Sequence, residues 1–128
     1  MSALPVIESI LSAAAPVTAI TGNRIYYSVA TQGAQVPYVV IVGTNESDET
    51  LLQGAAQYPE AFITTVAYGA DFPTVETLGN AIIAALQDSR GTYRGRTATV
   101  SRDAGDSFDF VEVDRVHRRI TNFRVWWR

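Results

Sequence analysis

Apolar side chains recur every three or four positions in two segments of the chain, and this spacing predicts two helices. The first covers residues 4–14, and Pro16 is expected to end it, because the residue before a proline avoids the helical conformation. The second covers residues 71–88, with Asp71 or Thr74 as its N-cap. The predicted core-facing side chains are Leu4, Ile7, Leu11 and Ala14 in the first helix, and Val75, Leu78, Ile82 and Leu86 in the second.

Between these helices, runs of β-branched and aromatic residues predict strands. A short extended piece is expected at residues 24–27 and a strong strand at residues 61–68. Another strand enters at Pro37, because a proline has no N–H to donate to a ladder and fits a strand's first position. It runs to Val42, and its unbroken Tyr-Val-Val-Ile-Val run predicts burial on both faces. The polar residues 43–60 are predicted to form an acidic loop or a loose hairpin.

The last part of the chain alternates apolar and polar residues, which is typical of half-buried strands. We expect a strand at 96–103, a hairpin turn at "AGDS" (104–107) and a strand at 108–114. In that strand Phe108, Phe110 and either Val111 or Val113 are expected to face the core. In a closing strand over 116–128, the predicted inward side chains are Thr121, Phe123, Val125 and Trp127, with Arg118, Arg124 and Arg128 opposite.

This order of elements predicts an α+β fold with a mostly antiparallel sheet and two helices packed on one face. The 128 residues are expected to form a single domain over 1–128, since a chain of this length buries roughly two-thirds of its unfolded surface. No apolar run approaches the roughly 18 residues that span a bilayer, so no membrane partner is expected. The first cation is Arg24, which argues against a secretory signal.

Charge is unevenly distributed along the chain. Residues 1–89 hold one arginine and eight acids, a formal charge of −7, whereas residues 90–128 hold nine arginines and five acids, a charge of +4. All ten basic residues are arginines, which suit planar pairing with carboxylates or phosphates, although a GC-rich genome explains the usage equally well. Such a chain can pair head to tail with its own copies or contact nucleic acid.

The sequence offers little catalytic chemistry. It has no cysteine, and His117, its only histidine, lies in a predicted strand between arginines, where a solvated or hydrogen-bonded role is the more typical one. The acids Asp103, Asp106 and Asp109 invite a calcium interpretation, but their spacing is better explained by a turn. We therefore predict a protein that is not an enzyme and has no cofactor or metal.

One pair of residues favours an interface instead. Trp126 and Trp127 are adjacent in the closing strand, so alternation sends one indole inward and the other outward. An exposed tryptophan between Arg124 and Arg128 has the composition of an interface anchor. Packing of both rings at the core's edge explains the pair as well.

The order of these segments resembles the small tail-completion, or tail-terminator, proteins of long-tailed bacteriophages, prophages and gene-transfer agents. The resemblance covers roughly residues 4–90, with "ITNFRVWW" familiar at the end. It rests on "GNRIYY", "QGAQVPYVVI" and "AFITTVAYGADFPTVETLGNAIIAAL", and within them on Arg24-Ile25-Tyr26, Pro37-Tyr38-Val39-Val40, Val66-Ala67-Tyr68 and Ala85-Leu86.

The resemblance implies a structural virion protein, a sheet with helices on one side, and assembly as a six-membered ring at the head-proximal end of the tail tube. Such a ring ends tube polymerisation, offers a surface to the head–tail connector protein and lets DNA pass without specific binding. Its implied partners are further copies of itself, the tail tube protein and the connector. Members can be monomeric in solution, and assembly in the bacterial cytoplasm is expected.

Charge then suggests how copies meet in such a ring, where one face of a subunit must complement a different face of the next. The candidate contact residues are Glu46, Asp48 and Glu49 on one side, Arg90, Arg94, Arg96, Arg118 and Arg119 on the other, and Trp126 and Trp127. A connector or stopper subunit and a small nucleic-acid-binding module remain the alternatives. The acidic pI of about 5.0 argues against the latter.

Overall fold

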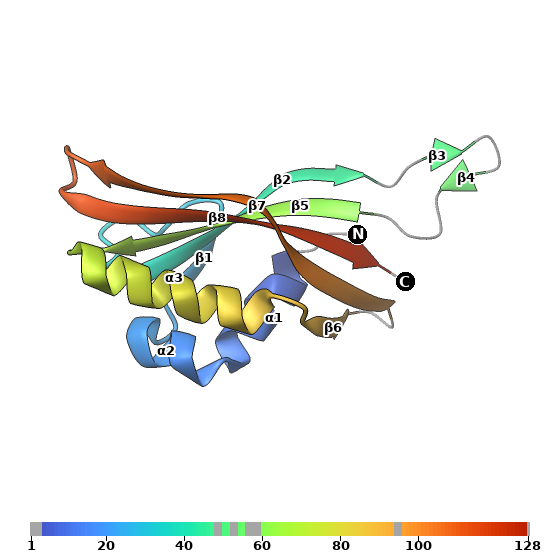
Figure 1. Cartoon of the computed structure of the whole chain (residues 1–128), viewed down its shortest axis with the longest axis horizontal. Coiled ribbons are helices and arrows are strands. Elements are labelled where there is room, and N and C mark those ends of the chain that lie inside the picture. The colour runs from blue at the N-terminus through green and yellow to red at the C-terminus, as the bar shows by residue number, and fades with distance from the viewer. Residues whose placement is uncertain (1–3, 48–49, 52–53, 56–59, 94–95, 128) are drawn as a thin grey trace.

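Six strands form one sheet, in the order β1-β2-β5-β8-β7-β6, and three helices cover one of its faces (Figure 1). The computed structural model describes the backbone of residues 4–47, 50–51, 54–55, 60–93 and 96–127, and the side chains of 4–43, 61–92, 97–103 and 105–126. The helices are α1 (Leu4–Ala13), α2 (Ala15–Thr21) and α3 (Phe72–Leu86). The strands are β1 (Ile25–Tyr27), β2 (Tyr38–Ser47), β3 (Thr50–Leu51), β4 (Gly54–Ala55), β5 (Glu60–Gly69), β6 (Arg90–Tyr93), β7 (Arg96–Val111) and β8 (Val116–Trp127).

The predicted α+β class is confirmed. Neighbouring strands of the large sheet run antiparallel, except that β1 runs parallel to β2. Along the chain, the small strands β3 and β4 lie between β2 and β5, and they pair antiparallel with each other as a separate two-stranded sheet (Figure 1). This pairing favours the hairpin alternative for residues 43–60.

Helix α3 follows its sequence signals closely. It begins at Phe72, where the Asp71 carboxylate accepts a hydrogen bond from the Thr74 N–H at 2.9 Å, as a helix N-cap does. The four predicted core residues of this helix, Val75, Leu78, Ile82 and Leu86, are at most 1% exposed. Burial of each such side chain contributes about 1.5–3 kcal/mol, so this stripe anchors the helix layer to the sheet.

The first helix differs from the prediction of one segment. α1 ends at Ala13, but the chain returns to a helical conformation at Ala15, with Pro16 in the first turn of α2. A proline is compatible with that position, because the first N–H groups of a helix have no partner within it. The expected stop at Pro16 is therefore a bend, and the layer holds three helices instead of two. None of the described helices alone matches a membrane span; α1 and α2 reach that length and composition only together, across an 87° bend.

The two strands with the clearest predicted patterns, β2 and β8, are confirmed. Val39 and Ile41 of β2 are buried beneath the helices, and Val40 on its other face is also buried. In β8 the odd positions Thr121, Phe123 and Val125 are buried as predicted. The side chain of Trp127 lies outside the described part of the chain.

The predicted hairpin turn at 104–107 is wrong. Residue pairing passes from Arg102–Phe123 to Asp106–Thr121, so β7 carries extra residues opposite β8 and continues as a bulged strand. Gly105 lies there at φ +102, a conformation that favours glycine. The chain reverses later, between the end of β7 and the start of β8 (residues 112–115).

Phe108 and Phe110 lie on the helix-covered face as predicted, opposite Arg119 and His117 of β8, but their expected burial is wrong. Phe108 and Phe110 are 42% and 44% exposed, and Val113 in the turn is 93% exposed. The reason is their position: α3 packs mainly over the central strands β5 and β8, whereas this part of β7 lies at the sheet's edge. Apolar and polar residues do alternate in this part of β7, but the helix layer does not cover its apolar side chains.

A buried arginine joins the helix layer to the bulged strand. The Arg119 guanidinium donates two hydrogen bonds to the Asp106 carboxylate, at 3.1 and 2.7 Å. It also donates to the Glu76 carbonyl of α3 at 3.1 Å and to the Asn80 side-chain oxygen at 2.7 Å. Arg119 is only 7% exposed, so these four bonds replace the water that its charge has lost.

Gly79 of α3 provides the space for this arginine, because a Cβ at this position would lie 2.3 Å from Arg119 Cδ. We predict that Gly79→Ala destabilises the protein by about 1–3 kcal/mol, as overpacking in a fixed site does. In an Arg119→Ala background the same change should stabilise by about 0.5–1 kcal/mol, the usual advantage of alanine within a helix. Urea unfolding of the parent protein, the two single variants and the double variant measures the coupling between the two positions. Equal effects of Gly79→Ala in both backgrounds would contradict the contact.

The free energy of unfolding should depend on pH through the same pair, Arg119 and Asp106. Hydrogen bonds from Arg119 lower the pKa of Asp106 below its usual 3.8. A carboxyl group whose pKa is lower in the folded chain adds stability above about pH 4, and this contribution is lost as pH falls through the lowered pKa. We expect Asp106→Asn to flatten the fall in unfolding free energy between about pH 5 and pH 2, measured by urea titrations. Glu112→Gln, in the exposed turn, is the matched control for loss of one charge, and equal profiles for both variants would contradict the prediction.

Candidate assembly surfaces

The strand pairings place one row of residues across the whole sheet, from edge to edge. In this Ser47–Arg90 row, the consecutive members are Ser47 of β2, Glu60 of β5, Trp126 of β8, Thr99 of β7 and Arg90 of β6. Both ends of the row are sheet edges among the described residues. β1 pairs with β2 only at residues 39–41, and no described strand pairs with the outer side of β6.

The predicted acidic and basic contact residues fall at the two ends of this row. Glu46 precedes Ser47 in β2, and the exposed Arg90 opens β6. Asp48, Glu49 and Arg94 lie outside the described residues, as do the side chains of Glu46, Arg96 and Trp127. The described chain thus brings an acidic position and a basic position to opposite edges at the same end of the sheet.

Arg118 lies on the helix-free face of β8, across from Asp109 of β7. Its Nε donates to Asp109 Oδ1 at 2.7 Å, and a terminal guanidinium nitrogen donates to Oδ2. These hydrogen bonds raise the pKa of Arg118 and lower that of Asp109, because each charge stabilises the other. Arg118 is therefore already paired within the subunit.

Arg119 occupies the opposite face and is buried beneath α3, bound to Asp106. Sequence reasoning grouped it with Arg118, yet neighbouring positions of a strand face opposite sides. Its charge is satisfied within the core, so Arg119 is not available to a neighbouring subunit.

Trp126 lies half-buried in the Ser47–Arg90 row. The Arg124 guanidinium carbon is 5.4 Å from the centre of its ring system and 5.2 Å from the centre of the Phe62 ring. Both rings attract the positive charge through their faces, and these cation–π contacts fix the orientation of the guanidinium. The predicted neighbourhood of Trp126 and Arg124 thus forms an ordered amphipathic surface on the helix-free face.

Two aspartates in the acid-rich segment of β7 form ion pairs with arginines of β8. Asp106 and Asp109 lie on opposite faces of the strand and bind Arg119 and Arg118, respectively. Among the described residues, no three histidine, aspartate or glutamate side chains come close enough to hold a metal ion. The calcium interpretation of this segment therefore finds no support in its geometry.

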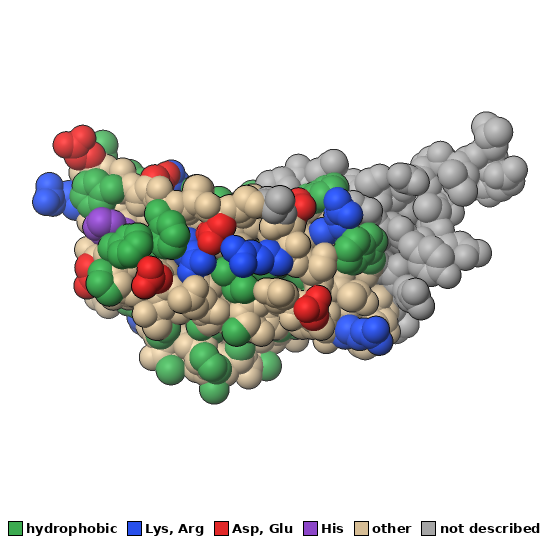
Figure 2. Space-filling model, in the orientation of Figure 1, with side chains coloured by type: hydrophobic (Ala, Val, Ile, Leu, Met, Phe, Trp, Pro, Cys, Tyr) green, Lys and Arg blue, Asp and Glu red, His purple; other side chains and the backbone are tan. Residues whose placement is uncertain are grey.

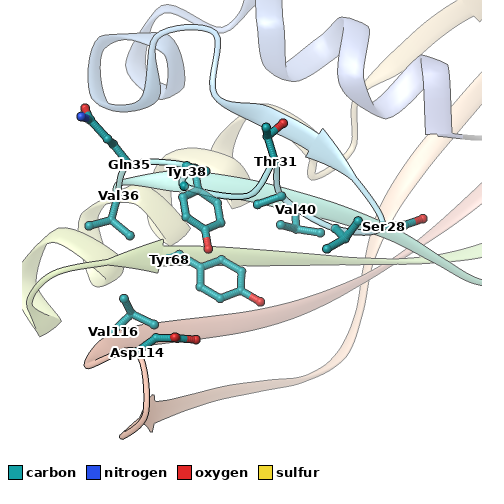
Figure 3. A pocket seen from close by; sticks show the side chains of 13 residues that line it. Ser28, Thr31, Gln35, Val36, Tyr38, Val40, Tyr68, Asp114 and Val116 are labelled. Carbon is teal, nitrogen blue, oxygen red and sulfur yellow. The ribbon is translucent and has the colours of Figure 1, made fainter.

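A cavity of about 790 Å³ lies on the helix-free face, near the β7–β8 turn (Figure 3). Its wall combines the loop 28–36 with Tyr38, Tyr68, Asp114 and Val116. The rings of Tyr38 and Tyr68 stack with centroids 4.6 Å apart, and burial raises the pKa of the Tyr38 phenol. Sequence reasoning missed this cavity, because only the register of β2 and β5 reveals that the two tyrosines face each other.

Comparison with known proteins identifies the family. Residues 6–128 match the family described as tail completion protein gp17. No curated protein matches the chain. A solved structure titled "Virion of native gene transfer agent (GTA) particle" contains a chain of similar fold, with a TM-score of 0.75 and 19% sequence identity, over 98% of this chain and 94% of that chain. By its family match, this chain belongs to the tail completion gp17 proteins, structural proteins of the phage tail and hence of the virion.

Proposed function

We propose that this tail protein assembles as a ring, most simply a hexamer, on the head-proximal end of the tail tube. There it stops tube polymerisation and presents a surface to the head–tail connector, while DNA passes through without specific binding. The observation that carries this proposal is the pair of open sheet edges at the two ends of the Ser47–Arg90 row. Membership in the tail completion family supports the location.

A closed ring needs a heterologous contact, in which one side of a subunit meets a different side of the next. The two edges of this sheet meet that requirement. Beyond Ile41, the outer side of β2 has no strand beside it among the described residues, and the outer side of β6 is open as well. Unpaired backbone groups at such edges are templates for another strand. Because the row places both edges at one level of the sheet, neighbouring subunits can meet without a shift along the ring axis.

Charge gives this contact a direction. Glu46 lies at the β2 edge and Arg90 at the β6 edge. Opposite charges across an interface steer association and disfavour pairing of like edges. The contact therefore favours head-to-tail pairing, the arrangement that a ring requires.

The first prediction concerns assembly itself. Native mass spectrometry and negative-stain imaging across protein concentration, with purified tail tubes added, should reveal rings or density that caps one end of each tube. A chain that stays monomeric and ignores tubes at every concentration would contradict the proposal. Connector partners and salt-dependent DNA binding would then be tested in its place.

The second prediction concerns the charged edges. Glu46→Arg or Arg90→Glu alone should weaken assembly on tubes at least tenfold at low salt, and the double reversal should restore much of it. Reversals at the exposed turn, Glu112→Arg and Arg115→Glu, are the matched controls and should leave the contact between copies unchanged. Neutralising Glu46, Asp48 and Glu49 together should also weaken assembly, and unchanged assembly in this variant would reject the pairing.

A further inference from the structure

The far end of β7 is a third open edge, distant from the Ser47–Arg90 row. β6 covers β7 only at residues 96–99, whereas β7 pairs regularly with β8 from Asp106 to Val111. In the described chain, the outer side of β7 from Ser107 to Val111 has no strand beside it. An edge strand of this kind presents unpaired N–H and C=O groups that a further strand can bind.

Exposed aromatic rings lie along the same segment. Phe108 and Phe110 alternate on one face of β7, and Phe72 at the start of α3 stands beside Phe108, with ring centroids 4.9 Å apart. We call Phe72, Phe108 and Phe110 the hairpin patch; each is between 42% and 44% exposed. Figure 2 shows hydrophobic side chains gathered at this end of the molecule, next to the single histidine.

Side chains of β8 hold the rings of Phe108 and Phe110 in place. The Arg119 guanidinium carbon lies 4.9 Å from the Phe108 ring centroid, and that guanidinium is itself fixed by Asp106 and α3. Phe110 packs against His117 of β8, with ring centroids 4.8 Å apart. A surface ordered before binding loses little conformational entropy when a partner arrives, which favours recognition.

Charge around the hairpin patch indicates what kind of partner fits. Asp71 precedes Phe72, and Glu112 and Asp114 follow in the turn, against the single Arg115. All four of these residues are exposed. The acids Asp106 and Asp109 are already paired with arginines, so the excess of negative charge at the surface comes from the other three. A basic partner is therefore favoured.

We propose that the β7 edge binds an extended segment of a different protein, which adds as a strand along Ser107–Val111. Apolar side chains at alternate positions of the segment cover the hairpin patch, and a lysine or arginine beside them meets the acidic turn. A second copy of the chain fits poorly, because its open β2 edge, Gly43–Ser47, is polar and carries Glu46. Its open β6 edge, Arg90–Tyr93, carries no aliphatic side chain to cover the rings. The site lies at the opposite end of β8 from the Ser47–Arg90 row, so it does not require the proposed ring.

A synthetic peptide provides a direct test with the full chain. The probe is a labelled RTVTVTVR amide, which combines alternating valines with terminal arginines. We expect binding by fluorescence anisotropy, together with slower hydrogen exchange at the amides of residues 107–111 in NMR spectra. The acidic analogue ETVTVTVE should bind at least tenfold more weakly, and an analogue N-methylated at alternate residues should not bind, because it cannot form the strand ladder.

Variants distinguish specific binding at the β7 edge from non-specific hydrophobic binding. Phe108→Ser with Phe110→Ser should weaken binding at least tenfold, and their partial exposure keeps the fold intact, which circular dichroism checks. Val113→Ser removes the most exposed apolar side chain of the turn but leaves the patch intact, so it should bind like the parent protein. No protection at residues 107–111 with millimolar peptide would overturn the proposal. Protection that grows with protein concentration alone would also overturn it, in favour of pairing between copies.

Discussion

The buried charge of Arg119 is the constraint on which much of this structure depends. A guanidinium that is removed from water must be paired and fully hydrogen-bonded, or it destabilises the fold by several kcal/mol. Its partners come from three places: Asp106 of β7, the Glu76 carbonyl and Asn80 of α3. The helix layer therefore cannot shift relative to the β7–β8 hairpin without breaking these bonds. Gly79 keeps the helix close enough for them to form.

The hydrogen bonds of Arg119 also reach an irregular part of β7. The bulge between Arg102 and Asp106 shifts the register, so that Asp106 stands opposite Thr121 and Phe108 stands opposite Arg119. The Asp106 carboxylate still accepts hydrogen bonds from Arg119. A tight turn at 104–107 would instead have ended the strand before Phe108. The bulge lets the strand continue to Val111, and this continuation forms the long edge beyond it.

Sequence reasoning succeeded where local signals decide the structure. The stripe and N-cap of α3, the two-sided burial of β2 and the alternation of β8 are each encoded within a few neighbouring residues. It failed where a distant partner decides. The segment at 103–106 fits a turn and a bulge equally well, and only its pairing with β8, a strand later in the chain, distinguishes them. Charge asymmetry between the chain's halves was visible in the sequence, but only the strand register places Glu46 and Arg90 at opposite edges of one level.

The two proposed contacts use opposite ends of the sheet. A ring contact that joins both edges at one level uses the end of the sheet where Ser47 and Arg90 lie, and it leaves the opposite end of β8 unobstructed. That opposite end has an open β7 edge, ordered aromatic rings and an acidic turn, and the cavity between Tyr68 and Asp114 lies on its other face. The proposed partner strand and the proposed ring contact therefore do not compete for the same edge. Because Arg119 couples the patch to α3 and not to the Ser47–Arg90 row, the two kinds of contact can be gained or lost independently.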